Sequence, residues 1–227
     1  MAGRLAADPF MKIDVLLSDP LHPVVPVLED WIISVSEQHE GRLLFDVAAA
    51  SGGDVLFLVS CGQIVGSDVR ARYGYVLVLH ASDLPEGRGW SPHVWAILDG
   101  VREITITLLD AADPVDTGDI WAKLKIPVDP GWLHDEINAS LFNGEVQLMN
   151  DWLKMISDDA RPTPQPAEIC SGHRRRTPAD SELDPRSPIA EQFNLLRVAD
   201  PVRFPAFFRL HGGKYKITLE RMEDEPR

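Results

Sequence analysis

The sequence predicts an α/β fold in which a mostly parallel sheet is flanked by helices. Short, unbroken apolar runs such as DVLFLVS (54–60) and YVLVLH (75–80) have the length of strands. Because these runs lack polar alternation, they suit strands that are buried on both faces of a sheet. Segments with helical spacing separate the runs, and alternating strands and helices indicate a Rossmann-like sheet rather than a sandwich or bundle.

Each element of this part has its own signal. Val27, Leu28, Trp31, Ile32 and Val35 recur at helical spacing after the turn at Ser18-Asp19-Pro20. Gly100 stops a second helix, and EITITLLD is enriched in β-branched residues, which makes it the last expected core strand. The expected strands cover 12–17, 42–47, 54–60, 75–80 and 103–110, and the expected helices cover 26–35 and 93–100.

The second half of the chain has a different texture. Apolar residues between Trp132 and Ile156 follow a helical period and predict one long amphipathic helix. The Pro-rich stretch DDARPTPQPAE reads as a connector, and KYKITLE near the end reads as a strand. We therefore expect a main domain over 1–130, a bridging helix over 131–160 and a small C-terminal α+β module over 161–227.

The composition is that of an ordinary globular protein, with 227 residues, 44% hydrophobic and 25% charged. Its net charge of -13 argues against non-specific binding to nucleic acid or to anionic membranes. An anionic ligand can still bind at a local basic patch.

Several features point to the cytoplasm. No apolar run approaches the roughly 20 residues that span a bilayer, and the start of the chain lacks the order of a signal peptide. The two cysteines, Cys61 and Cys170, lie outside any metal-ligand spacing. We expect a reducing compartment, with neither a disulfide nor a metal.

The candidate chemistry lies where two expected strands end. His80 closes one strand, and DAADPVDTGDI, with four aspartates, follows another. Taken singly, the histidine could bond a backbone carbonyl and the acidic run could be a solvated turn. Because the carboxyl ends of parallel strands share one edge, we expect the two to meet as a base and its orienting partner.

The stretch from residue 54 to 128 resembles the 10-formyltetrahydrofolate-dependent formyltransferases. The family pattern runs Asn-x-His, a small residue, Ser, x-Leu-Pro, Arg-Gly and x-x-Pro, then a strand and an Asp-x-Gly-x-Ile loop. The upstream VSCGQIV also resembles the family segment beside the folate. The matching residues are His80, Ser82, Leu84, Pro85, Arg88, Gly89, Pro92, Asp116, Gly118, Asp119 and Ile120.

The resemblance implies a catalytic domain that moves a formyl group from N10 of the folate to an amine. His80 would stabilise charge or shuttle the proton, and Asp116 would hold His80 and a water. For Arg88, a surface salt bridge to Asp83 or Glu86 is an equal alternative. The folate pocket would be formed by Gln63, Ser82, Leu84, Pro85, Arg88, Gly89, Asp110, Asp113 and Gly118.

One position departs from the family pattern. Val78 stands where the family has the asparagine that donates a hydrogen bond to the developing oxyanion. Gln63 or Asn194 could replace this donor, or activity could be weak or absent. Because the rest of the motif is intact, we expect activity to be retained.

The tail resembles those of bacterial enzymes that formylate amino sugars on nucleotide carriers, as in surface polysaccharide biosynthesis. Arg174, Arg175, Asn194 and Arg197 would then bind the acceptor, with guanidinium groups on its diphosphate. The alternative for Arg197 is a structural role that holds the tail against the long helix.

Other acceptors stay open. Transfer RNA is disfavoured by the length and the acidic charge, whereas hydroxyornithine, an aminoglycoside or glycinamide ribonucleotide would each fit a formyltransferase. A non-catalytic folate-binding relative is the further alternative, because of Val78. The sequence leaves the oligomeric state open, a homodimer included.

Overall fold

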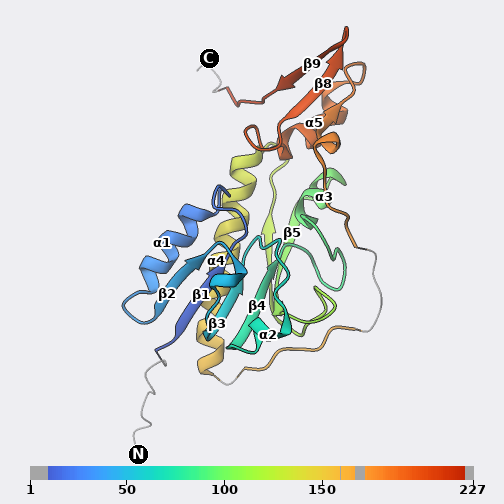
Figure 1. The fold of residues 1–227 in the computed structure, drawn as a ribbon. Helices are drawn as coiled ribbons and strands as arrows, with labels where there is room; N and C mark the ends of the chain where they lie inside the picture. Colours follow the sequence, from blue (N-terminus) through green and yellow to red (C-terminus); the bar gives the residue numbers. More distant parts are fainter. Residues whose placement is uncertain (1–9, 159, 167–171, 223–227) are drawn as a thin grey trace, which may run out of the picture.

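The computed structural model describes residues 10–158, 160–166 and 172–222, and its centre is a six-stranded sheet (Figure 1). The strand order is β2-β1-β3-β4-β5-β6. The strands are β1 (Lys12–Leu16), β2 (Glu40–Leu44), β3 (Gly53–Leu58), β4 (Tyr73–His80), β5 (Glu103–Asp110) and β6 (Ile120–Pro127).

The predicted α/β class with a mostly parallel sheet is confirmed, with two corrections at one edge. Strands β1 to β4 pair in parallel, but β5 runs antiparallel to β4. Strand β5, which the sequence predicts to be the last core strand, is also not the last, because β6 continues the sheet beyond it. Strand β6 escaped notice because its edge position leaves Lys123 and Lys125 within it, so it lacks an unbroken apolar run.

Helices cover both faces of this sheet. Helices α1 (Val25–Val35) and α4 (His134–Ser157) pack on one face, where Trp31, Phe57 and Trp152 belong to the largest apolar cluster. The smaller cluster on the other face includes Val69 from α2 (Ser67–Arg70) and packs against the 3-10 turn η1 (Val47–Ala49). Helix α3 (Pro92–Leu98) follows the loop after β4.

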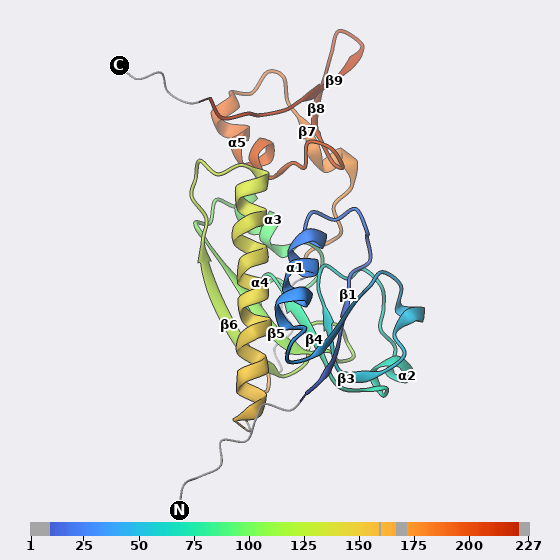
Figure 2. The ribbon, with the colours of Figure 1, turned by 90° about the vertical axis from the view of Figure 1, so that its left-hand side faces the viewer.

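The C-terminal elements form a second, three-stranded sheet beyond one end of α4 (Figure 2). Helix α5 also contacts α3 and α4. The elements are η2 (Pro178–Ser181), β7 (Glu182–Leu183), α5 (Ile189–Val198), β8 (Ala206–Leu210) and β9 (Gly213–Ile217). The domain boundaries expected near residues 130 and 160 stay predictions.

The core of the main domain contains one unusual carboxyl group. Glu145 on α4 is 3% exposed, and its Oε2 has no hydrogen-bond partner within the described part of the chain. Burial raises the pKa of Glu145 from 4.5 to about 8. The folded protein therefore holds this carboxyl in its neutral form near pH 7.

This burial predicts that Glu145→Gln stabilises the protein in mild alkali. Between about pH 4.5 and 8 the native state keeps a proton that the unfolded chain has lost, so the wild type loses stability as the pH rises. Near pH 8 we expect the variant to be more stable by about 1–3 kcal/mol, and near pH 5 about equal. Urea unfolding across this range measures the difference. Asp151→Asn, a partly exposed change on the same helix, is the control. If the free energies of unfolding of wild type and Glu145→Gln change in parallel with pH, the raised pKa of Glu145 is contradicted.

Candidate active site

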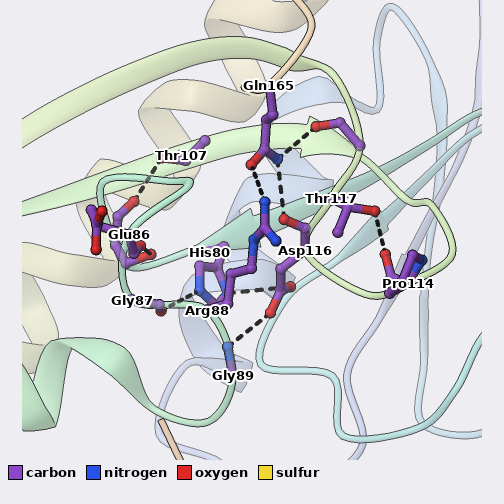
Figure 3. A network of polar contacts seen from close by, with 12 residues as sticks. His80, Glu86, Gly87, Arg88, Gly89, Thr107, Pro114, Asp116, Thr117 and Gln165 are labelled. Carbon is purple, nitrogen blue, oxygen red and sulfur yellow. Dashed lines mark hydrogen bonds and ion pairs between the residues drawn. The ribbon is translucent and has the colours of Figure 1, made fainter. Parts of the chain in front are cut away.

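His80 lies at the end of β4, where 7% of the residue is exposed. Its Nε2 is 3.0 Å from the carbonyl oxygen of Gly87 in the following loop (Figure 3). Because a carbonyl only accepts, Nε2 must carry the hydrogen, and in the neutral ring Nδ1 keeps a free lone pair. That Nδ1 lies 3.6 Å from Oδ1 of Asp116.

Asp116 reaches His80 from the loop after β5. Its Oδ2 accepts a hydrogen bond of 3.0 Å from the Gly89 N–H, so the aspartate joins the two loops. The contact between Asp116 and His80 is predicted from the sequence, but the reason for it, that two parallel strands end at the same edge, is wrong. Since β5 is antiparallel to β4, its end pairs with Leu77 instead of meeting the end of β4, and the loop must turn back to bring Asp116 to His80.

Two glycines allow this close packing of loops. A Cβ on Gly118 would lie 1.8 Å from the carbonyl oxygen of Asp110, and one on Gly89 would lie 2.3 Å from that of His173. Gly89 also has a φ of 99°, which glycine adopts without steric cost. Both motif glycines are therefore required by backbone contact.

A residue that the sequence analysis missed lies beside the pair. Gln165, from the Pro-rich connector, donates from Nε2 to the carbonyls of Asp116 (3.1 Å) and Gly118 (2.7 Å). Arg88 donates to its Oε1 at 3.2 Å. The expected partner Asp83 instead pairs with Lys123.

Other predicted folate residues have partners within the chain. Ser82 donates to the carbonyl of Glu86, Leu84 is fully buried, and Asp113 pairs with Arg70. Asp110 accepts from the indole of Trp121 at 2.8 Å, and burial raises its pKa.

A cavity of about 380 Å³ opens near Asp110, toward the N-terminal half of β4 and away from the His80 end. It is lined by Arg70, Tyr73, Gly74, Tyr75, Val76, Asp110, Ala111, Trp121, Arg161 and Pro162.

Residues 16–153, more than half of the chain, match the family model described as formyl transferase. This segment contains both strands and both loops that hold His80 and Asp116. The chain belongs to the formyl transferase family.

A curated formyl transferase relative is the methionyl-tRNA formyltransferase of Agathobacter rectalis. It is 31% identical over 179 residues, which cover 75% of this chain and 56% of the relative. The chain spans about half the length of the curated relatives that it matches.

Several solved structures share the fold at lower identity. The methionyl-tRNA formyltransferase from Clostridium thermocellum has a TM-score of 0.80 and 18% identity, with 94% of each chain covered. HypX from Aquifex aeolicus with tetrahydrofolic acid has a TM-score of 0.77 and 20% identity, over 93% of this chain and 38% of that one. A sugar N-formyltransferase from Shewanella sp FDAARGOS_354 has a TM-score of 0.69 and 16% identity, covering 95% and 99%.

The departure from the formyl transferase motif at Val78 leaves an apolar side chain near His80. Both residues are on β4 two positions apart, so they lie on the same face of the strand. Of the two suggested replacement donors, Gln63 donates from Nε2 to the Phe45 carbonyl, whereas Asn194 accepts from Arg197 through Oδ1.

The basic start of the C-terminal module lies beside the loop after β4. His173 pairs through its backbone with Arg88 and Trp90, and its ring stacks on Trp95. The guanidinium of Arg175 is 4.7 Å from the Trp90 ring, and that of Arg174 is 5.1 Å from the Trp95 ring. Both arginines are exposed, but Arg174 pairs with the carboxylate of Asp180, so it is the charge of Arg175 that is accessible to an anionic ligand.

Arg197 has a different environment. It is 2% exposed and donates to Oδ1 of Asn194 and to the carbonyls of Asp129 and Trp132 in the turn that precedes α4. Burial lowers its pKa. These contacts favour the structural alternative, in which Arg197 joins the module to the long helix, although through carbonyls and not through an acidic partner.

The part of the chain that the structure describes holds no group of three or more His, Cys, Asp or Glu residues arranged for a metal ion. None of its helices combines the length and apolarity that crossing a bilayer requires. Cys61 is a free thiol, and Cys170 lies outside the described residues.

The contacts of Arg197 predict that Arg197→Met destabilises the fold. Methionine keeps the apolar stem and leaves the buried acceptors unpaired, at a cost of about 2–3 kcal/mol. Urea unfolding measures this loss, and Arg209→Met, an exposed change in the same module, serves as the control. A normal unfolding midpoint together with weakened binding of a nucleotide sugar would instead assign Arg197 to the ligand.

Proposed function

We propose that this protein is a cytoplasmic N-formyltransferase that transfers the formyl group of 10-formyltetrahydrofolate to an amino sugar on a nucleotide carrier. The His80–Asp116 pair, inside the segment that matches the formyl transferase family, is the observation that carries the proposal. The tetrahydrofolic acid complex of a relative with the same fold supports the folate as co-substrate.

The residues of the site suit the chemistry of this transfer. The acceptor amine attacks the formyl carbon and forms the new C–N bond, while the carbonyl oxygen gains negative charge. The amine must then lose a proton, and N10 must gain one before its bond to the formyl carbon breaks. An imidazole whose Nδ1 is free and faces a carboxylate can take the proton from the amine and return it to N10.

One observation supports a pocket for the folate beside this pair. Nε of Arg88 is buried and has no partner in the described part of the chain, which fits a polar group of a ligand. Because Val78 donates nothing, we assign stabilisation of the oxyanion to the His80 imidazolium that forms once the ring has taken the proton from the amine.

The proposal of a nucleotide-linked amino sugar as acceptor rests on the charge of the protein and on the position of the C-terminal module. Arg175 lies on Trp90, where its guanidinium group can reach a diphosphate. Arg174 lies on Trp95 and already pairs with Asp180, so it would share its charge between that carboxylate and the ligand. The curated relatives carry a second candidate, the amine of methionyl-tRNA. The length of the chain does not distinguish the two acceptors, because the methionyl-tRNA formyltransferase from Clostridium thermocellum is matched over 94% of its own chain. The net charge of -13 disfavours a long polyanion.

An acceptor panel tests the proposal. The purified protein is given 10-formyltetrahydrofolate with nucleotide-linked amino sugars, glycinamide ribonucleotide, hydroxyornithine, an aminoglycoside or methionyl-tRNA, and the formamide product is identified by mass. We expect turnover with an amino sugar and a KM that rises with ionic strength, since screening weakens the contacts to phosphate. Turnover with methionyl-tRNA alone would refute the sugar acceptor, and turnover with none would favour the non-catalytic alternative.

The proposed base predicts that His80→Gln abolishes most of the activity. The glutamine amide can still donate to the Gly87 carbonyl, but it cannot accept the proton of the amine. We expect kcat to fall by at least about 10²-fold, with the affinity for a folate analogue little changed. Stopped-flow turnover and titration measure the two effects, with His211→Gln in an exposed turn as control. Activity within a few-fold of wild type would remove His80 from the chemistry.

A further inference from the structure

Gln165 is the feature of the site that neither the motif nor the family match accounts for, since it lies beyond residues 16–153. Its side-chain amide makes three hydrogen bonds, two as donor and one as acceptor (Figure 3). The orientation of the amide is fixed by chemistry. The two carbonyls can only accept and the Arg88 guanidinium can only donate, so Nε2 must face the carbonyls.

The donor side of this amide holds an unusual turn. Asp116 has a φ of 60°, in the left-handed region that costs a non-glycine residue about 1 kcal/mol or more. In this conformation its carbonyl faces Gln165, while its carboxylate faces Gly89 and His80. Gln165 therefore stabilises the backbone conformation that directs the carboxylate into the site.

The acceptor side holds the opposite loop. Arg88 stands between Gly87, whose carbonyl contacts His80, and Gly89, whose N–H contacts Asp116. One amide thus contacts both segments that carry the His80–Asp116 pair. The connector is itself anchored to the sheet, because Thr163 and Ile120 exchange two backbone hydrogen bonds of 2.8 Å.

We propose that Gln165 is a positioning residue for formyl transfer, acting through Asp116. The inference rests on the proposed function, because it assigns a role in that reaction. Loss of the two donated bonds lets the turn relax toward negative φ and withdraws the carboxylate from His80. A displacement of about 1 Å in a reacting group can reduce the rate by roughly 10²-fold without loss of binding.

Two variants separate the donor from the acceptor. Gln165→Leu removes both functions, whereas Gln165→Glu keeps the length and the acceptor for Arg88 but loses both donated bonds. We expect kcat to fall by about 10²-fold in both, with the KM for 10-formyltetrahydrofolate changed by less than about three-fold. Thr163→Ala, in the same connector, keeps its backbone bonds and should match the wild type. A stable and fully active Gln165→Glu would overturn the proposal. The loss of activity in Gln165→Leu would then follow only from a loss of thermal stability.

A double-mutant cycle tests whether Gln165 acts through Asp116. Adding Gln165→Leu to Asp116→Asn should cost less than about three-fold, although it costs about 10²-fold in the wild type. A merely structural role predicts that the two losses multiply. A double variant about 10²-fold slower than Asp116→Asn would therefore refute the inference.

A crystal structure of Gln165→Leu gives a readout that does not depend on turnover. We expect Asp116 to leave the left-handed conformation and its carboxylate to leave the Gly89 N–H. An Asp116 that has not moved would overturn the inference even if the variant has lost its activity. Absence of turnover in the wild type, with Asp116 displaced in the variant, would count against the proposed function alone.

Discussion

The hydrogen bond from the Gly89 N–H to the carboxylate of Asp116 joins two loops that the sheet alone would leave apart. One loop follows β4 and carries Gly87, and the other follows β5, which runs in the opposite direction. Without this bond the carboxylate would have no fixed distance to His80, and the 3.6 Å separation that supports proton transfer would be lost. The close backbone contacts at Gly89 and Gly118 follow from the same requirement.

The site is completed by chain beyond the family-matched segment. Gln165 contacts the Asp116 turn, and the backbone of His173 pairs beside Gly89 in the manner of a short added strand. Arg174 and Arg175 then lie on the aromatic rings that follow this loop. A change in the connector or in the start of the module can therefore alter the chemistry of the main domain.

Charge is distributed unevenly in this protein. The chain as a whole is strongly acidic, whereas the surface beside the His80 loop carries exposed guanidinium groups. Such an arrangement repels a long polyanion and admits a small one that reaches the basic patch. Buried ionisable groups behave differently: Glu145 is held neutral, and burial lowers the pKa of His93 to about 4.

The sequence by itself determined the fold class and the place of His80 in the fold. Unbroken apolar runs can only be stable when buried on both faces, so β3 and β4 were predictable, and so was the placement of His80 at the end of β4. Only the tertiary structure decided the direction of β5, the edge strand β6 and the role of Gln165. Parallel and antiparallel neighbours both satisfy the backbone of a strand, so the direction of β5 leaves no mark on its residue pattern. An edge strand that contains lysines resembles a loop in sequence. A single amide in a Pro-rich connector carries no periodic signal, because its function arises from contacts about 50 residues away along the chain.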